Sequence, residues 1–184
     1  EVAHQGNISR DGLDCGEILE DESARQRSQR VDEHHVRIIR EAGITEVYVR
    51  SPLACDARRA FEVFTDLGSW WDPASTPDPE AFGGIEATPG VGGEVVLRLD
   101  GTPRPLGRVT AWEPGAHYAQ TYLPHWWGPE GTRPTWLDVT FTDEGGVCLV
   151  ELRHGGWDST NLVLRQRCTD WPDLLGRFAR ACAG

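Results

Sequence analysis

The chain has 184 residues, with 18 basic side chains against 29 acidic ones and a formal net charge of -11 at pH 7. This length suits one domain, or one domain with an appendage. The acidic balance argues against nucleic acid and against an anionic membrane surface as partners, because both attract clustered cations. All 18 basic residues are arginine, which excludes a P-loop lysine, a Schiff base and a lysine general base.

Composition changes near residue 44. Residues 1–43 contain no aromatic residue and no proline, so we expect an N-terminal extension that adds little to a core. The first part of this extension reads as disordered. Residues 20–42 predict one amphipathic helix that ends at Gly43, with its apolar stripe at Val31, His35, Ile38, Ile39 and Ala42. Such a helix is suited to docking a protein partner.

The domain predicted over residues 44–184 begins with a strand and a helix. Residues 44–50 alternate as in a strand, which Pro52 is expected to close. Residues 56–66 predict a helix with Asp56 as its N-cap. The apolar face of this helix holds Ala57, Ala60, Phe61 and Phe64. Residues 72–79 contain three prolines and are expected to be irregular.

Short strands and turns follow from residue 84 onward. The predicted strands are 93–99, 107–113, 117–122, 136–142 and 147–154. In the last two, alternation places Leu137, Val139 and Phe141 on one face, and Val150, Leu152 and His154 on another.

The chain ends in a predicted helix, capped by Asp170 or Thr169, with Pro172 in its first turn. Its apolar stripe consists of Leu174, Leu175, Phe178 and Cys182. An antiparallel sheet needs one face covered, and this helix is the long amphipathic element available. The fold class is therefore α+β, with a curved antiparallel sheet around a C-terminal helix.

Six stretches of the sequence, in this order, carry a resemblance to a known family. They are residues 60–66 leading to Trp70 and Trp71, then 92–95, 107–114, 137–142, 150–157 and 171–178. With them, residues 44–184 resemble the START-like (SRPBCC) superfamily, in the branch of the activator of the ninety-kilodalton heat-shock chaperone ATPase. The resemblance implies a helix-grip fold with a cavity between sheet and helix, where many members bind an apolar ligand. It brings no single catalytic motif.

Two pairs of adjacent tryptophans, Trp70–Trp71 and Trp126–Trp127, precede loops rich in proline and glycine. Adjacent side chains cannot both enter one core in regular structure, so at least one tryptophan of each pair is expected at a rim or lid. We expect a wall of aromatic rings around an apolar ligand, with a few polar groups among them. The candidate ligand-binding residues are Trp70, Trp71, Arg108, Trp112, Tyr122, His125, Trp126, Trp127, His154 and Trp157. The alternative is that the tryptophans plug the open end of the core and the histidines are structural.

Other chemistries find little support in the sequence. His34 and His35 lie about 100° apart on a helix, so they cannot chelate together, and no zinc-type spacing occurs. No GxSxG or GxGxxG motif is present. We therefore expect no metal, no cofactor and no assigned catalytic residue. The five cysteines lack CxxC spacing and read as reduced thiols of a cytoplasmic protein. Arginine without lysine suggests GC-rich, bacterial coding.

Three functions remain open from the sequence. The first is a carrier or sensor of a hydrophobic or aromatic small molecule. The second is an aromatase/cyclase-type enzyme that uses the same cavity, with histidine or arginine moving protons. The third is a chaperone-associated interaction module. The enzyme would need a pair of acid and base groups inside the cavity. It ranks second because the sequence offers only His154 and Arg108 for that role.

Overall fold

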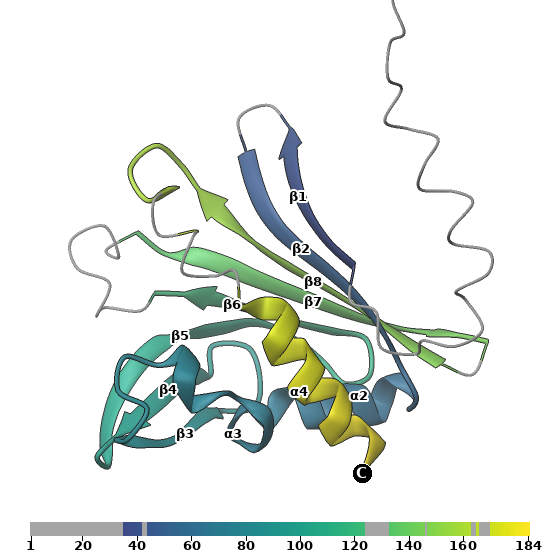
Figure 1. Ribbon diagram of the computed structural model, residues 1–184, viewed down its shortest axis with the longest axis horizontal. Helices are drawn as coiled ribbons and strands as arrows, with labels where there is room; N and C mark the ends of the chain where they lie inside the picture. Colours follow the sequence, from purple (N-terminus) through teal and green to yellow (C-terminus); the bar gives the residue numbers. More distant parts are fainter. Residues whose placement is uncertain (1–34, 42–43, 124–132, 146, 163–164, 166–169) are drawn as a thin grey trace, which may run out of the picture. The chain divides into compact units, whose positions relative to one another are not determined.

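The computed structural model describes residues 35–41, 44–123, 133–145, 147–162, 165 and 170–184. Within these ranges an antiparallel sheet of eight strands runs in the order β1-β2-β8-β7-β6-β5-β4-β3 (Figure 1). The strands are β1 (His35–Glu41), β2 (Ile44–Leu53), β3 (Phe82–Ala87), β4 (Glu94–Leu99), β5 (Thr102–Glu113), β6 (His117–Tyr122), β7 (Thr135–Glu144) and β8 (Val147–Trp157). All five strands predicted after residue 84 are confirmed, within a few residues at their ends.

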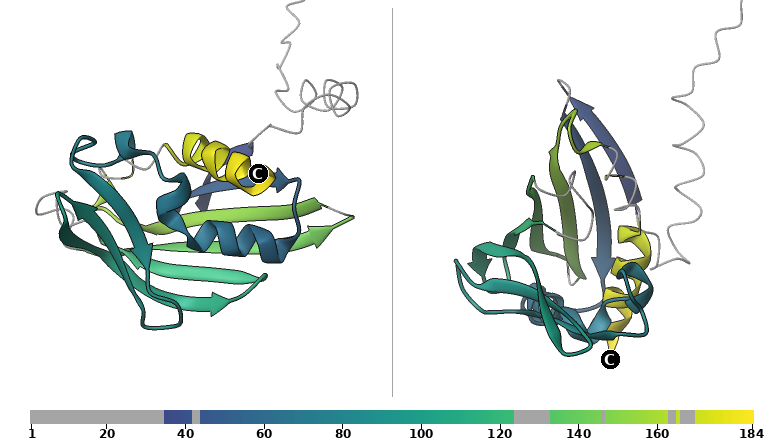
Figure 2. Two further views of the ribbon diagram at one scale, coloured as in Figure 1. Left: turned by 90° about the horizontal axis from the view of Figure 1, so that it is seen from below. Right: turned by 90° about the vertical axis from the view of Figure 1, so that its left-hand side faces the viewer.

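The sheet curls around its helices (Figure 2). Register irregularities interrupt the β2–β8, β3–β4, β4–β5 and β5–β6 pairs. Such bulges bend a strand and increase its twist, which is how a sheet acquires a concave face. The first half of β5 pairs with β4 and its second half with β6, so β5 carries the chain round the bend.

Helix α2 (Ala57–Thr65) packs against β6, β7 and β8. The side chain of Asp56 accepts a hydrogen bond from the backbone N–H of Arg59 at 2.7 Å, which confirms it as the N-cap. The Asp143 carboxylate accepts a second bond from the N–H of Ala57 at 2.8 Å and so ties α2 to the β7–β8 hairpin. The buried face of α2 consists of Ala57, Ala60, Phe61, Val63 and Phe64, which includes all four predicted positions.

Helix α4 (Trp171–Ala183) contacts α2, β2 and the short helix α3 (Leu67–Trp70). Its buried side chains are Trp171, Leu174, Leu175, Phe178 and Cys182, so the predicted stripe is confirmed. Asp170 holds the N-cap position, but its side chain makes no capping hydrogen bond. Thr169 lies outside the described residues. Figures 1 and 2 show α2 and α4 on the same side of the sheet.

Residues 35–41 correct the predicted helix over 20–42. They form β1, which pairs with β2 from His35 opposite Arg50 to Glu41 opposite Ile44. Isoleucines at 38 and 39 and valine at 36 suit a strand as well as a helix, and the neighbouring strand decides between the two. Residues 20–34 lie outside the described residues. The sheet thus includes residues on the N-terminal side of residue 44.

Three smaller differences concern local structure. Pro52 does not close β2, which continues to Leu53 with Pro52 opposite Leu149. Residues 72–79 are irregular as predicted, except for one 3-10 turn, η1 (Pro73–Ser75). Strand β3 was not predicted, because two of its six residues are glycine and a single side chain, Ile85, is buried.

Gly107 of β5 lies close to the backbone of β6. A Cβ atom placed on Gly107 would lie 1.8 Å from the carbonyl oxygen of Thr121, which is backbone and cannot swing away. We therefore expect Gly107→Ala to lower the free energy of unfolding by about 2–3 kcal/mol, as overpacking does. Gly83→Ala is the matched control. Gly83 is also a strand glycine, and a Cβ atom placed on it would lie 3.4 Å from the side chain of Arg98, an ordinary contact distance. We therefore expect Gly83→Ala to change the free energy of unfolding by no more than about 0.5 kcal/mol. Equal effects in urea unfolding would contradict the close approach.

Candidate functional site

Three neighbouring strands have their ends beside the start of α4. β6 ends at Tyr122, and β7 begins directly opposite it at Thr135. β8 passes through His154 to its last residue, Trp157. Trp171, the first residue of α4, is hydrogen-bonded to His154. We call these five buried residues, Tyr122, Thr135, His154, Trp157 and Trp171, the His154 cluster.

Hydrogen bonds fix the tautomer of His154. The indole N–H of Trp171 donates to Nδ1 of His154 at 3.0 Å, and because an indole can only donate, Nδ1 carries no proton. The proton of the neutral ring is therefore on Nε2, which donates to Oγ1 of Thr135 at 2.8 Å. The Thr135 hydroxyl donates in turn to the backbone carbonyl of Tyr122 at 3.1 Å. Both ring nitrogens of His154 are thus engaged.

Burial keeps this imidazole neutral. His154 is 0% exposed, and desolvation of the charged form lowers its pKa to about 3. At neutral pH the ring is therefore uncharged, and the imidazolium form that would act as a general acid is absent. Its one lone pair is taken by Trp171, so it is also not free to act as a base. The prediction that His154 faces inward with Val150 and Leu152 is confirmed, since all three side chains are fully buried.

Aromatic rings surround His154. Ring centroids lie 4.9 Å away for Trp157, 5.1 Å for Tyr122 and 5.9 Å for Trp171. The Trp157 indole donates to the backbone carbonyl of His154 at 3.2 Å. Trp71 extends this wall, with its ring edge-on to Trp171 at 5.8 Å. The result is an apolar interior built of flat surfaces, a lining that suits flat apolar molecules.

The rim position predicted for one of Trp70 and Trp71 is wrong. Trp70 is 2% exposed and Trp71 is 7% exposed, so both enter the interior. The rule about adjacent side chains holds in regular structure, but Trp70 is the last residue of α3 and Trp71 is its C-cap, with φ -59° and ψ 143°. This change of backbone direction lets both rings turn inward. They contact each other at 5.7 Å between centroids.

Two further candidates lie away from the cluster. Arg108 is not an interior polar group: its side chain is 63% exposed and pairs with Glu94 at 3.0 Å. Its strand neighbour Val109 is buried, so alternation turns Arg108 outward. Trp112 is half-buried and packs edge-on against Phe61 at 5.4 Å, toward the other end of β6. His125, Trp126 and Trp127 lie outside the described residues.

Sequence reasoning missed the partners of His154 and a second buried polar pair. Thr135 and Trp171 are 19 and 17 residues from His154, and no local pattern links them. The Tyr118 hydroxyl donates to Oε1 of Gln120 at 2.6 Å inside the core. Burial raises the pKa of Tyr118, which keeps it a neutral donor. The available signal was alternation, because Tyr118 and Gln120 share the inward face of β6 with Tyr122.

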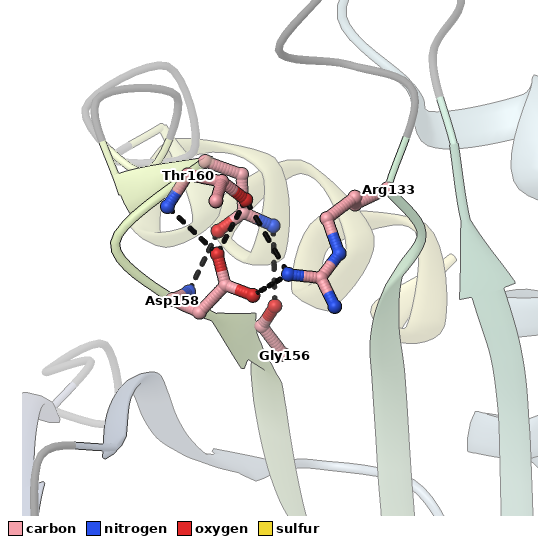
Figure 3. Close-up of polar contacts among 5 residues, drawn as sticks. Arg133, Gly156, Asp158 and Thr160 are labelled. Carbon is pink, nitrogen blue, oxygen red and sulfur yellow. Dashed lines mark hydrogen bonds and ion pairs between the residues drawn. The ribbon is translucent and has the colours of Figure 1, made fainter.

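A polar network closes the end of β8 next to the cluster (Figure 3). Arg133, just before β7, forms an ion pair with Asp158, just after β8. The hydroxyl and backbone N–H of Thr160 both donate to Oδ1 of Asp158, at 2.6 and 2.8 Å. These bonds, and then the charge of Arg133, hold the pKa of Asp158 below its usual range. Buried Asn161 accepts from the N–H of Asp158 at 2.7 Å and donates to the carbonyl of Gly156 at 3.2 Å.

Three cysteines that are distant in sequence gather at the C-terminal end of α4. The thiols of Cys55 and Cys182 are hydrogen-bonded, and Cys148 donates its backbone N–H to the carbonyl of Cys55 at 3.0 Å. Burial raises the pKa of all three thiols, that of Cys148 to about 12. Thiols in this state are poor nucleophiles, so this group packs as part of the core.

Two other kinds of feature are missing from the part of the chain that the structure describes. No group of three histidine, cysteine or carboxylate side chains there is arranged to hold a metal ion. None of the helices described above has the length and apolar character that crossing a membrane requires.

Comparison with known proteins gives structural relatives. No protein-family model matches the chain, and no curated protein matches it. Among solved structures, the Aha1 dimer from Colwellia psychrerythraea matches with a TM-score of 0.53 and 19% identity, over 71% of this chain and 90% of that one. Txn09, an anthrahydroquino-gamma-pyrone synthase, matches with a TM-score of 0.53 and 26% identity, over 73% and 95%. The chain has the helix-grip fold of the START-like superfamily.

A third solved structure has a similar fold. CalU16 from Micromonospora echinospora is similar with a TM-score of 0.53 and 15% identity, over 80% of each chain. The predicted resemblance and the predicted fold class are therefore confirmed. In this fold the His154 cluster lies between the sheet and the first residue of α4.

Proposed function

We propose that the protein binds a flat, hydrophobic small molecule against the His154 cluster, between the sheet and α4, as a carrier or sensor. The observation that supports this is the composition of the interior. Aromatic rings surround one neutral imidazole whose polar atoms are already hydrogen-bonded. Such a lining attracts rings by contact of faces and edges and makes no demand for a charged ligand.

Among the sequence candidates, we assign ligand contacts to Trp71, Tyr122 and Trp157. Trp127 joins them as a candidate from the β6–β7 connection, whose two flanks, Leu123 and Arg133, adjoin the ends of β6 and β7. Arg108 is left out because its side chain is paired with Glu94 and faces solvent.

A cyclase-type enzyme is the second candidate function. The 26% identity with Txn09 favours it over the interaction module. In such an enzyme His154 would line the site and would not act as the acid or base, because both its ring nitrogens are hydrogen-bonded and its pKa is low. Proton transfer would have to come from other groups or from the substrate itself.

Titration with the neutral fluorescent probe N-phenyl-1-naphthylamine tests the binding function. We expect saturable, one-site binding in the micromolar range, which corresponds to about -8 kcal/mol. Trp127→Ala should weaken the affinity at least about fivefold, since an aromatic contact is lost. If neither this probe nor a panel of flat apolar compounds saturates, the binding function fails.

Trp136→Ala is the matched control. Trp136 lies on the outward face of β7, next in sequence to Thr135, and covers Gly155 and Gly156. Its loss should leave the probe affinity unchanged within about twofold, because it does not face α4. An equal loss of affinity in Trp136→Ala and Trp127→Ala would indicate surface adsorption of the probe and would count against an interior site.

A further inference from the structure

One buried donor in the interior has no partner. Among the described residues, Nε1 of Trp71 is the single buried side-chain nitrogen or oxygen without a hydrogen bond. Its neighbours differ: Trp70 donates to the carbonyl of Val63 at 3.0 Å, and Trp171 donates to His154. Buried polar groups are almost always paired, so an isolated one calls for an explanation.

Hydrogen bonds hold the chain on both sides of Trp71. The backbone N–H of Trp71 donates to the carbonyl of Leu67 at 3.0 Å. On α4, the Arg177 side chain donates to the carbonyl of Trp70 at 3.1 Å and to the Asp72 carboxylate at 3.4 Å. The Trp71 ring itself packs against Trp70 of α3 and Trp171 of α4, so little side-chain freedom remains to be lost when a ligand meets its N–H.

We propose that the ligand carries a hydrogen-bond acceptor, the sp² oxygen of a ketone or quinone, which takes up the N–H of Trp71. An indole nitrogen donates and cannot accept, so an ammonium or any pure donor leaves it unpaired. A charged carboxylate would have to be desolvated among apolar rings, which is costly without a cation. A neutral carbonyl on a flat ring system satisfies the donor and the aromatic lining together. This inference rests on the proposed binding function.

A matched pair of ligands tests it: 9-fluorenone, which has a ketone, and fluorene, which has the same tricyclic skeleton without one. We expect the full chain to bind fluorenone about tenfold more tightly than fluorene, the ratio that one buried hydrogen bond gives. In Trp71→Phe, which keeps an aromatic ring and removes the N–H, the ratio of the two affinities should fall to near one, whatever the change in the affinity for fluorene. Trp112→Phe, at the other end of β6, should keep the tenfold ratio.

Proton–nitrogen NMR of the indole groups gives a readout in the unmodified chain. The Trp71 signal, identified by its loss in Trp71→Phe, should move downfield with fluorenone and move little with fluorene. Equal affinity for the two compounds, with no selective shift of this signal, would overturn the carbonyl inference and leave the binding function standing. Saturable binding of neither compound would overturn both.

Discussion

Replacing Phe178 by alanine should lower the free energy of unfolding by about 3–5 kcal/mol, the range for a large aromatic side chain removed from a core. Phe178 is fully buried on the inward face of α4. Its ring meets Phe64 edge-on at 5.4 Å and Trp70 at 5.5 Å between centroids. These partners come from α2 and α3, so Phe178 of α4 connects α2, α3 and α4 on the concave side of the sheet. Urea unfolding followed by circular dichroism measures the change.

Arg180→Ala is the control on the same helix. Arg180 lies two residues further along α4 and is exposed, so its removal should change the unfolding free energy by no more than about 0.5 kcal/mol. The pair separates packing from helix propensity, because both variants place alanine inside α4. If Phe178→Ala lowers the free energy of unfolding by less than about 0.5 kcal/mol, Phe178 does not pack in the core and α4 does not cover the concave face of the sheet.

The elements that were predicted correctly carry their pattern in their own side chains. Alternation along β7 and β8 was clear because one face of each strand is buried and the other is not. Helix α4 has an apolar stripe at helical spacing, and α2 has its capping aspartate at the expected place. In each case local sequence and tertiary packing point to the same structure.

The elements that were missed are specified by their neighbours. β1 has apolar residues that fit a helix or a strand, and pairing with β2 decides which forms. β3 has glycines where other strands have side chains, so its partner β4 defines it. Both are the terminal strands in the order of the described sheet, so each has one neighbouring strand instead of two.

The candidate site divides in the same way. Residue type and alternation were enough to select Tyr122, His154 and Trp157, which the fold brings together. Residue type alone selected Arg108, and there it failed, because a nearby glutamate on β4 pairs with it at the surface. The hydrogen bonds that fix the tautomer of His154 join β7, β8 and α4, and such long-range contacts have no local sequence signal.

The buried histidine should make the protein sensitive to acid. Its pKa is about 3 in the folded state, against about 6.5 when unfolded. Between these values the unfolded chain binds one more proton, so stability rises with pH and is lost as the pH falls below about 6.5. The slope approaches about 1.4 kcal/mol per pH unit, so His154 should account for a loss of about 3 kcal/mol between pH 7 and pH 4.

Two variants isolate this effect. His154→Gln removes the titrating group, so its unfolding free energy should lack the slope that His154 adds in the parent, and its deficit at pH 7 should shrink by about 3 kcal/mol at pH 4. Thr135→Val removes the hydroxyl partner and keeps the buried imidazole. It should be less stable at pH 7 by about 1–3 kcal/mol, the cost of an unpaired buried donor, and should retain the acid slope. Parallel pH profiles for the parent and His154→Gln, from urea unfolding at half-unit steps, would show that His154 is protonated in the folded state and that the Trp171 bond to Nδ1 does not persist.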